Sequence, residues 1–114
     1  MKKILILLTC VFIMLPVFAK TDKNSVEYLK EKNPAIKIVA VEPDSSPVLS
    51  EGKAGAHKIQ GIGAGFVPKV LNTEIYDEII CIEDKDAFAE GKRFAVTEGM
   101  LVGITSGAAL KAAG

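Results

Sequence analysis

Apolar and polar residues along this chain form blocks that predict short helices and strands covered on both faces. Residues 24–32 place Val26 and Leu29 among charged side chains, which favours a short helix. Residues 36–42 (IKIVAVE) and 78–83 (EIICIE) are rich in β-branched residues and nearly all apolar. Runs of this kind are typical of strands in parallel sheets, where helices cover both faces.

The last part of the chain is expected to form a helix, a strand and a second helix. Residues 84–98 carry one apolar stripe at helical spacing. Its members are Ala87, Phe88, Gly91, Phe94 and Ala95. Asp84 is the expected N-cap of this helix and Gly99 its expected C-terminal stop. A third strand is expected at residues 101–104, followed by a helix that opens at Thr105.

The predicted order is therefore strand, long loop, strand, helix, strand, helix. This order predicts an α/β fold with a parallel sheet. The long loop, residues 44–77, is rich in glycine and proline. Loops of that length are usually functional or unstructured, so this one is a candidate for binding.

The first nineteen residues follow a different pattern and read as a signal-peptide-like helix. Lys2 and Lys3 precede an apolar run without charge, and Val17 and Ala19 occupy the positions that a signal peptidase reads. The run is shorter than the ~20 residues of a membrane-spanning helix. A cleavable signal is therefore favoured over an uncleaved anchor or a misassigned start codon. The chain divides into a leader (1–19), a junction (20–26) and an α/β segment (27–114).

Charge and composition exclude several classes of function. Lysine plus arginine number 14 and aspartate plus glutamate also number 14, so the formal net charge is zero. A nucleic-acid partner is not expected, because it requires a basic patch or stripe. With His57 as the one histidine and Cys81 as the one cysteine beyond the leader, a metal site, a catalytic triad or an internal disulfide is unsupported.

Two segments could carry chemistry. Gly61, Gly63 and Gly65 stand at alternate positions of the long loop, where glycine lets a backbone approach a ligand closely. By spacing alone a flexible surface loop is the favoured interpretation of these glycines. The second segment, residues 103–109 (GITSGAA), places two hydroxyls where a strand is expected to meet a helix. Ligands bind at that edge of open α/β sheets, although Thr105 or Ser106 could instead cap the helix.

Five segments together resemble the cysteine synthase (O-acetylserine sulfhydrylase) family. They are EYLKEKNP (27–34), IKIVAVEP (36–43), SPVLS (46–50), HKIQGIGAGFVPKV (57–70) and EGMLVGITSGAAL (98–110). The resemblance implies a partial parallel-sheet layer of a fold type II (tryptophan synthase beta-like) pyridoxal-phosphate enzyme. It also implies a transferase of cysteine biosynthesis, in which sulfide replaces the acetate of O-acetylserine.

The resemblance assigns roles to a few residues of this chain. Thr105 matches the hydroxyl residue, usually serine in the family, that bonds the pyridine nitrogen of the cofactor, and Ser106 is its neighbour. Gly61 and Gly63 match a loop facing the substrate side of the cleft. Leu101 matches a position that lines the small-ligand pocket.

The family's Schiff-base lysine, its Thr-Ser-Gly-Asn substrate loop and its phosphate cradle lie upstream of the matched region. Residues 20–26 (KTDKNSV) do not resemble them. We therefore expect a truncated cysteine synthase-like protein that is inactive alone. The alternatives are an exported non-enzymatic binding module and the C-terminal part of a split enzyme, with a complementing N-terminal fragment or self-association. A genuine leader implies a secreted or periplasmic protein, whereas the family implies the cytoplasm.

We predict that the leader directs export and is cut between Ala19 and Lys20. N-terminal sequencing of the protein expressed in a bacterial host should begin at Lys20. A variant with glutamate at Ala19 should remain uncut, since signal peptidase requires a small residue there. Recovery of intact Met1 from the soluble cytoplasmic fraction of the unmodified protein would contradict this prediction.

Overall fold

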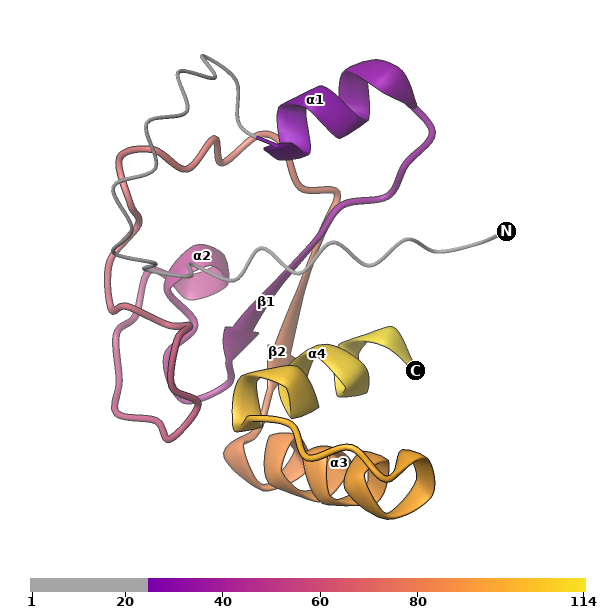
Figure 1. Ribbon diagram of the computed structural model, residues 1–114. Coiled ribbons are helices and arrows are strands. Elements are labelled where there is room, and N and C mark those ends of the chain that lie inside the picture. Colours follow the sequence, from indigo (N-terminus) through magenta and orange to yellow (C-terminus); the bar gives the residue numbers. More distant parts are fainter. Residues whose placement is uncertain (1–24) are drawn as a thin grey trace, which may run out of the picture.

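The computed structural model describes residues 25–114, which form a two-stranded parallel sheet and four helices (Figure 1). In chain order the elements are α1 (Ser25–Lys32), β1 (Val39–Pro43), α2 (Val48–Glu51), β2 (Glu78–Ile82), α3 (Asp84–Glu98) and α4 (Ile104–Ala113). The expected leader, residues 1–19, lies outside the described residues. Among residues 25–114, no helix is both long and apolar enough to cross a membrane.

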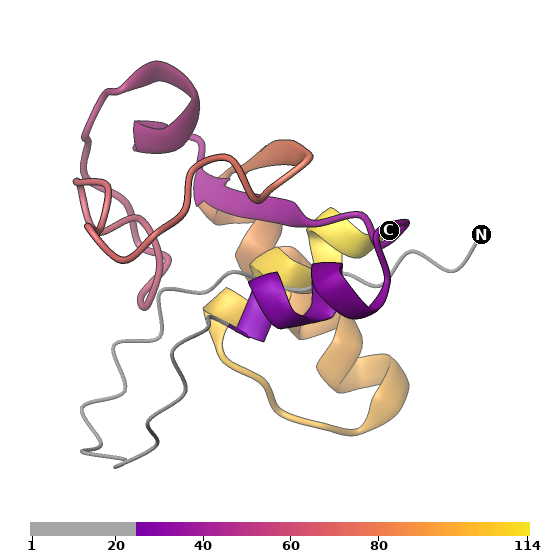
Figure 2. The same cartoon turned by 90° about the horizontal axis from the view of Figure 1, so that it is seen from above.

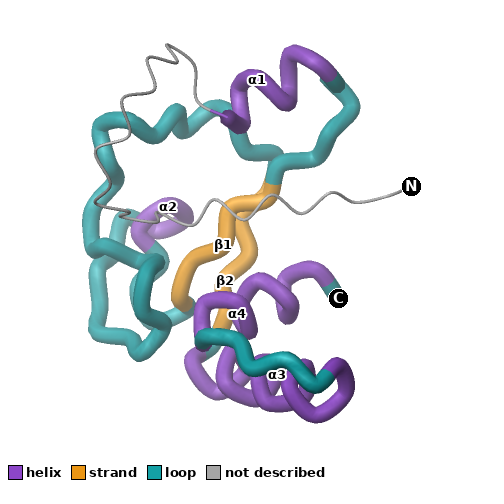
Figure 3. Tube along the Cα trace, viewed as in Figure 1, coloured by secondary structure: helices purple, strands orange, loops and turns teal. Residues whose placement is uncertain are grey.

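Two of the three expected strands form, as β1 and β2, and they pair in parallel. Their register runs from Val39 opposite Glu78 to Pro43 opposite Ile82. All five residues of β1 are buried, whereas β2 is partly exposed. Helices α3 and α4 lie side by side at one end of the sheet, and α1 lies at the other end (Figures 1 and 3). The α/β class predicted from the hydrophobic pattern is confirmed.

The larger core lies between the sheet, the long loop and the α3–α4 pair. Its buried members are Val41, Ile59, Ile62, Ile82, Ala87 and Ala108. Two of them, Ile59 and Ile62, belong to the glycine-rich part of the long loop, so this part of the loop is held in the core rather than free in solvent. Seen from above, most of the loop lies to one side of the strands (Figure 2), and its last residues return to α1, where Asn72 donates a hydrogen bond to Glu27.

A second, smaller core joins α1 to the start of the sheet, and Asp77 ties it together. One carboxylate oxygen accepts a hydrogen bond from the backbone N–H of Ile38 at 2.7 Å, and the other pairs with Lys30 Nζ at 2.6 Å. The Ile38 N–H and, secondarily, the Lys30 ammonium lower the pKa of Asp77 below its usual 3.8. The Asp77 carboxylate thereby links α1 to the residues that directly precede both strands.

The expected third strand at residues 101–104 is wrong. Residues 101–103 form the connection between the last two helices, and Ile104 already begins α4. A strand requires a hydrogen-bonded neighbour, but this segment lies against α3 and lines a groove with Phe88 and Gly91. The apolar composition predicted a buried strand, but residues 101–103 are exposed and have no strand to pair with.

Gly107 sets how closely α4 approaches α3. A Cβ atom on Gly107 would lie 2.0 Å from the carbonyl oxygen of Ala87 and 2.9 Å from the amide nitrogen of Gly91. The two helix backbones are therefore in contact at this point. Gly91 faces the same contact with more room, since its own Cβ would have no neighbour nearer than 3.8 Å.

We predict that Gly107→Ala lowers the free energy of unfolding by about 2 kcal/mol or more, because the methyl group must push two backbones apart. Gly91→Ala is the matched control in the same helix pair. It should be neutral or stabilising by up to ~1 kcal/mol, since alanine favours a helix over glycine. Urea unfolding followed by circular dichroism measures both. Equal effects of the two substitutions would show that the close approach is not limiting.

Candidate functional site

The glycine-rich loop passes over the carboxyl end of β1. Gly63 has a φ of +62°, and a Cβ there would lie 2.6 Å from both His57 Nε2 and Pro43 Cγ. His57 Nε2 is hydrogen-bonded to the carbonyl oxygen of Gly63 at 2.8 Å, which closes the loop on itself. His57 is thus a half-buried loop residue with a local structural contact.

Two further contacts fasten this loop to the starts of α3 and α4. The backbone N–H of Lys58 donates to Asp84 Oδ2 at 2.9 Å, and the hydroxyl of Thr105 donates to the carbonyl oxygen of Gln60. The loop, the carboxyl end of β1 and two helix N-termini therefore meet in one place. The sequence predicted this edge as the ligand side of the sheet.

Thr105 does not cap its helix. The N-cap of α4 is Gly103, without a side-chain capping bond, and the Thr105 hydroxyl reaches across to the loop instead. The capping interpretation of this residue is wrong because a tertiary acceptor replaces the local one. Asp84 is likewise the first residue of α3 rather than its N-cap, which is Glu83. The Asp84 carboxylate instead accepts a hydrogen bond from the loop at Lys58. Gly99 ends α3 as predicted, in a left-handed backbone conformation.

The structure brings some of the predicted site residues together and separates others. A Cβ on Gly61 would lie 3.6 Å from Thr105 Oγ1, so these two positions face each other. Ser106 is exposed on the first turn of α4. Leu101 has 94% of its surface exposed and lines the groove beside α3, whereas Gly63 lines a different hollow under the loop.

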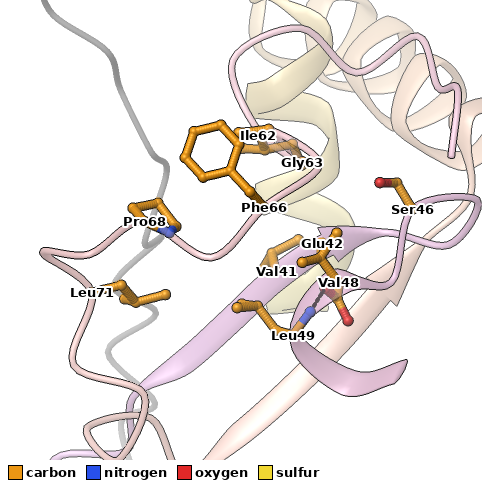
Figure 4. A pocket seen from close by; sticks show the side chains of 11 residues that line it. Val41, Glu42, Ser46, Val48, Leu49, Ile62, Gly63, Phe66, Pro68 and Leu71 are labelled. Carbon is orange, nitrogen blue, oxygen red and sulfur yellow. Dashed lines mark hydrogen bonds between the residues drawn. The ribbon is translucent and has the colours of Figure 1, made fainter. Parts of the chain in front are cut away.

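That hollow lies between β1, α2 and the loop, and Figure 4 shows the side chains around it. They are Val41, Glu42, Ser46, Val48, Leu49, Ile62, Gly63, Ala64, Phe66, Pro68 and Leu71. Its enclosed volume is about 40 Å³, enough for water but not for an amino-acid substrate. This hollow is therefore a small gap in the packing of the loop.

Glu42 is a buried carboxylate that the sequence patterns did not single out. Only 3% of its surface is exposed, and it accepts hydrogen bonds from Leu49 N at 2.7 Å and from Ser50 N at 3.1 Å and Ser50 Oγ at 2.5 Å. These bonds hold α2 against the strand. The sequence did contain a sign of this role, since Glu42 is an acidic residue at the end of the largely apolar run 36–42.

Cys81 lies opposite Glu42 in the sheet register, with its Sγ 3.7 Å from Glu42 Oε1. Desolvation raises the pKa of the Cys81 thiol above its usual 9.0, and the Glu42 carboxylate acts in the same direction. A thiol with a raised pKa holds little thiolate at neutral pH, so the environment of Cys81 does not favour a nucleophile.

Thr105 and Gly61 are the predicted cofactor-side and substrate-side residues that the structure places next to each other. The Thr105 hydroxyl can donate to a ring nitrogen, and Gly61 has no side chain to obstruct a ring next to that hydroxyl. Within residues 25–114, no cluster of three or more histidine, cysteine, aspartate or glutamate side chains could hold a metal ion.

The sequence matches a family model described as "Pyridoxal-phosphate dependent enzyme" over residues 25–114. The chain belongs to this family. It is 56% identical over 85 residues to a cysteine synthase of Staphylococcus aureus, a match that covers 75% of this chain and 27% of that relative. The predicted resemblance to cysteine synthases is confirmed.

Solved structures of this family share the fold. A cysteine synthase of Entamoeba histolytica superposes with a TM-score of 0.70 at 47% identity, covering 73% of this chain and 25% of that chain. A hydrogen sulfide-producing enzyme of Fusobacterium nucleatum gives 0.70 at 43% identity, covering 77% and 31%. This confirms the fold type II prediction. The chain spans about a quarter of the length of the curated relatives it matches.

We predict that Gly63→Ala destabilises the protein more than Gly65→Ala, by about 1–3 kcal/mol. Both positions have positive φ, so both substitutions carry the dihedral cost. A methyl on Gly63 additionally meets His57 and Pro43, whereas the nearest atom to one on Gly65 lies at 3.7 Å. Urea unfolding of the two variants isolates the steric part. If the two variants unfold alike, the close packing of the loop on β1 does not matter for stability.

Proposed function

We propose that this chain forms the C-terminal part of a cysteine synthase-type active site, in which sulfide replaces the acetate of O-acetylserine. The observation that carries the proposal is the placement of the Thr105 hydroxyl opposite Gly61, at the sheet edge where two helix N-termini meet. The 56% identity to a cysteine synthase supports the same reaction class.

In this proposal each predicted residue has one role. The Thr105 hydroxyl donates a hydrogen bond to the pyridine nitrogen of pyridoxal phosphate, and Ser106 lies next to Thr105 on α4. Gly61 and Gly63 let the loop backbone approach the substrate, and Leu101 lines a small-ligand surface. When bound, the cofactor supplies an electron sink that this chain's side chains lack.

The remaining parts of such a site require another polypeptide segment. Neither a Schiff-base lysine nor a phosphate cradle is assigned among residues 25–114. The complementing segment we propose corresponds to the N-terminal part of the relatives. The partly exposed strand β2 supports this, since Ile79 and Cys81 on it remain accessible to a further chain or to a second copy.

An exported, non-enzymatic binding module is the second candidate function. One observation favours it: the charged start, apolar run and small residues of positions 1–19 match the pattern of an export signal. In this candidate the protein acts outside the cytoplasm, away from the metabolites of cysteine synthesis. The cytoplasmic alternative requires that the leader stays inactive.

We predict that the 114-residue chain alone forms no cysteine from O-acetylserine and sulfide in the presence of pyridoxal phosphate. Mixing it with a polypeptide that carries the N-terminal three quarters of the S. aureus cysteine synthase should produce turnover. Thr105→Val should lower that turnover at least tenfold, whereas Thr105→Ser should retain it, because serine keeps the hydroxyl.

The matched control is Thr97→Val, which removes a hydroxyl bonded to Arg93 O within α3, away from the loop. It should leave turnover in the mixture unchanged. Cysteine formation by the chain alone, in proportion to its concentration, would contradict the proposal. The same would follow if the mixture were inactive although the two polypeptides co-purify.

A further inference from the structure

The Thr105 hydroxyl already has an acceptor inside this chain. It donates to the backbone carbonyl of Gln60, in the glycine-rich loop, across 45 residues of sequence. A hydroxyl carries a single proton and can donate one hydrogen bond at a time. That proton is therefore committed to the loop in the structure described.

The ring nitrogen assigned to Thr105 under the proposed function needs the same proton. The two acceptors thus compete, and one bond forms at the expense of the other. Gly61 directly follows Gln60 and faces Thr105. A Cβ atom on Gly61 would lie 3.6 Å from Thr105 Oγ1. A ring placed next to this hydroxyl therefore also meets the loop backbone.

Losing the Thr105 bond would free one part of the loop and leave the rest attached. The Lys58 N–H still bonds Asp84, and His57 still bonds Gly63. Between these two contacts, Gln60 and Gly61 are exposed and bond α4 through Thr105, while Ile59 and Ile62 beside them are buried in the core. Loss of the Thr105 bond removes one of the contacts that oppose opening of residues 59–62, so this stretch should leave the core more often.

We propose that Thr105 is a latch on the glycine-rich loop, residues 57–65. Its hydroxyl holds the loop closed by a hydrogen bond to the Gln60 carbonyl. An unprotonated ring nitrogen that accepts this hydrogen bond instead releases the carbonyl and the loop. Occupancy of the cofactor-ring side is thereby linked to freedom of the loop on the substrate side. This inference rests on the proposed function, because that function supplies the ring nitrogen.

Trypsin cleavage at the Lys58–Ile59 bond reports the latch. Ile59 is fully buried, so cleavage there requires residues 59–62 to leave the core. The Lys69–Val70 bond is the internal control, since Val70 has 88% of its surface exposed and is cut without opening of the loop. Initial rates at both bonds are obtained by mass spectrometry of the full chain.

Without ligand, Thr105→Val should raise the rate at Lys58 about tenfold, as expected for one lost hydrogen bond, and leave the rate at Lys69 unchanged. Thr105→Ser should behave like the unmodified chain because it keeps the donor. Thr97→Val should have no effect at either bond. An unchanged Lys58 rate in Thr105→Val overturns the latch.

The ligand arm uses pyridoxine 5′-phosphate, which has the ring nitrogen but no aldehyde to modify lysines. It is added to the mixture with the N-terminal polypeptide that supplies the phosphate cradle, at an alkaline pH at which the ring nitrogen is unprotonated. Its fluorescence reports binding in the same samples. Binding with a faster Lys58 cut in the unmodified chain, and no further increase in Thr105→Val, supports the proposal. Binding without a faster cut overturns the latch and leaves the proposed function standing. If the mixture does not bind the ligand, the proposed function fails at cofactor recognition, whereas the ligand-free comparison of Thr105→Val with the unmodified chain still decides whether Thr105 holds the loop.

Discussion

The contact between the backbones of α3 and α4 at Gly107 determines where every other part of the site lies. Because Gly107 has no side chain, α4 approaches the Ala87 carbonyl closely enough to bury Ala87 and Ala108 completely. This approach fixes the first turn of α4, and with it Thr105, two residues earlier. A wider separation of the helices would move the Thr105 hydroxyl away from the Gln60 carbonyl that it bonds.

Parallel pairing brings the chemistry of this segment to one edge. The carboxyl ends of β1 and β2 point the same way, so the turn after β1, the start of α3 and the returning loop converge there. The ring of Pro43 packs against Gly63, and the Asp84 carboxylate accepts a hydrogen bond from the backbone of Lys58 in the loop. The polar groups of the loop are satisfied by groups far apart in sequence, which is how an irregular segment can lie against a core.

Periodicity was sufficient where the local sequence decides the structure. The fifteen residues of α3 were predicted with the bounds that the structure shows, since an apolar stripe and Gly99 specify a helix and its end. Strand and helix differ less clearly for short apolar runs, and the segment 101–103 had no neighbouring strand to pair with. Hydrophobicity alone does not identify what a segment packs against.

The hydrogen-bond partners of polar side chains were the least predictable part of the site. Glu42 ends a strand-like run, and its three hydrogen bonds to Leu49 and Ser50 arise only because the chain turns back on itself after Pro43. Thr105 could have capped α4 by local geometry, but the loop offers it a carbonyl from Gln60. Such contacts depend on the tertiary arrangement, so spacing identifies the residue without its partner.

The separation between β1 and β2 along the chain has a kinetic consequence. Residues 44–77 must close into a loop before the strands can pair, and closure entropy grows with the length of the loop. Helices α3 and α4 are joined by residues 99–103 alone, so their docking closes a far shorter loop. Local contacts form early and distant ones late in folding. We therefore expect the helical pair to dock first, and the glycine-rich loop to reach Thr105 only after the sheet has formed.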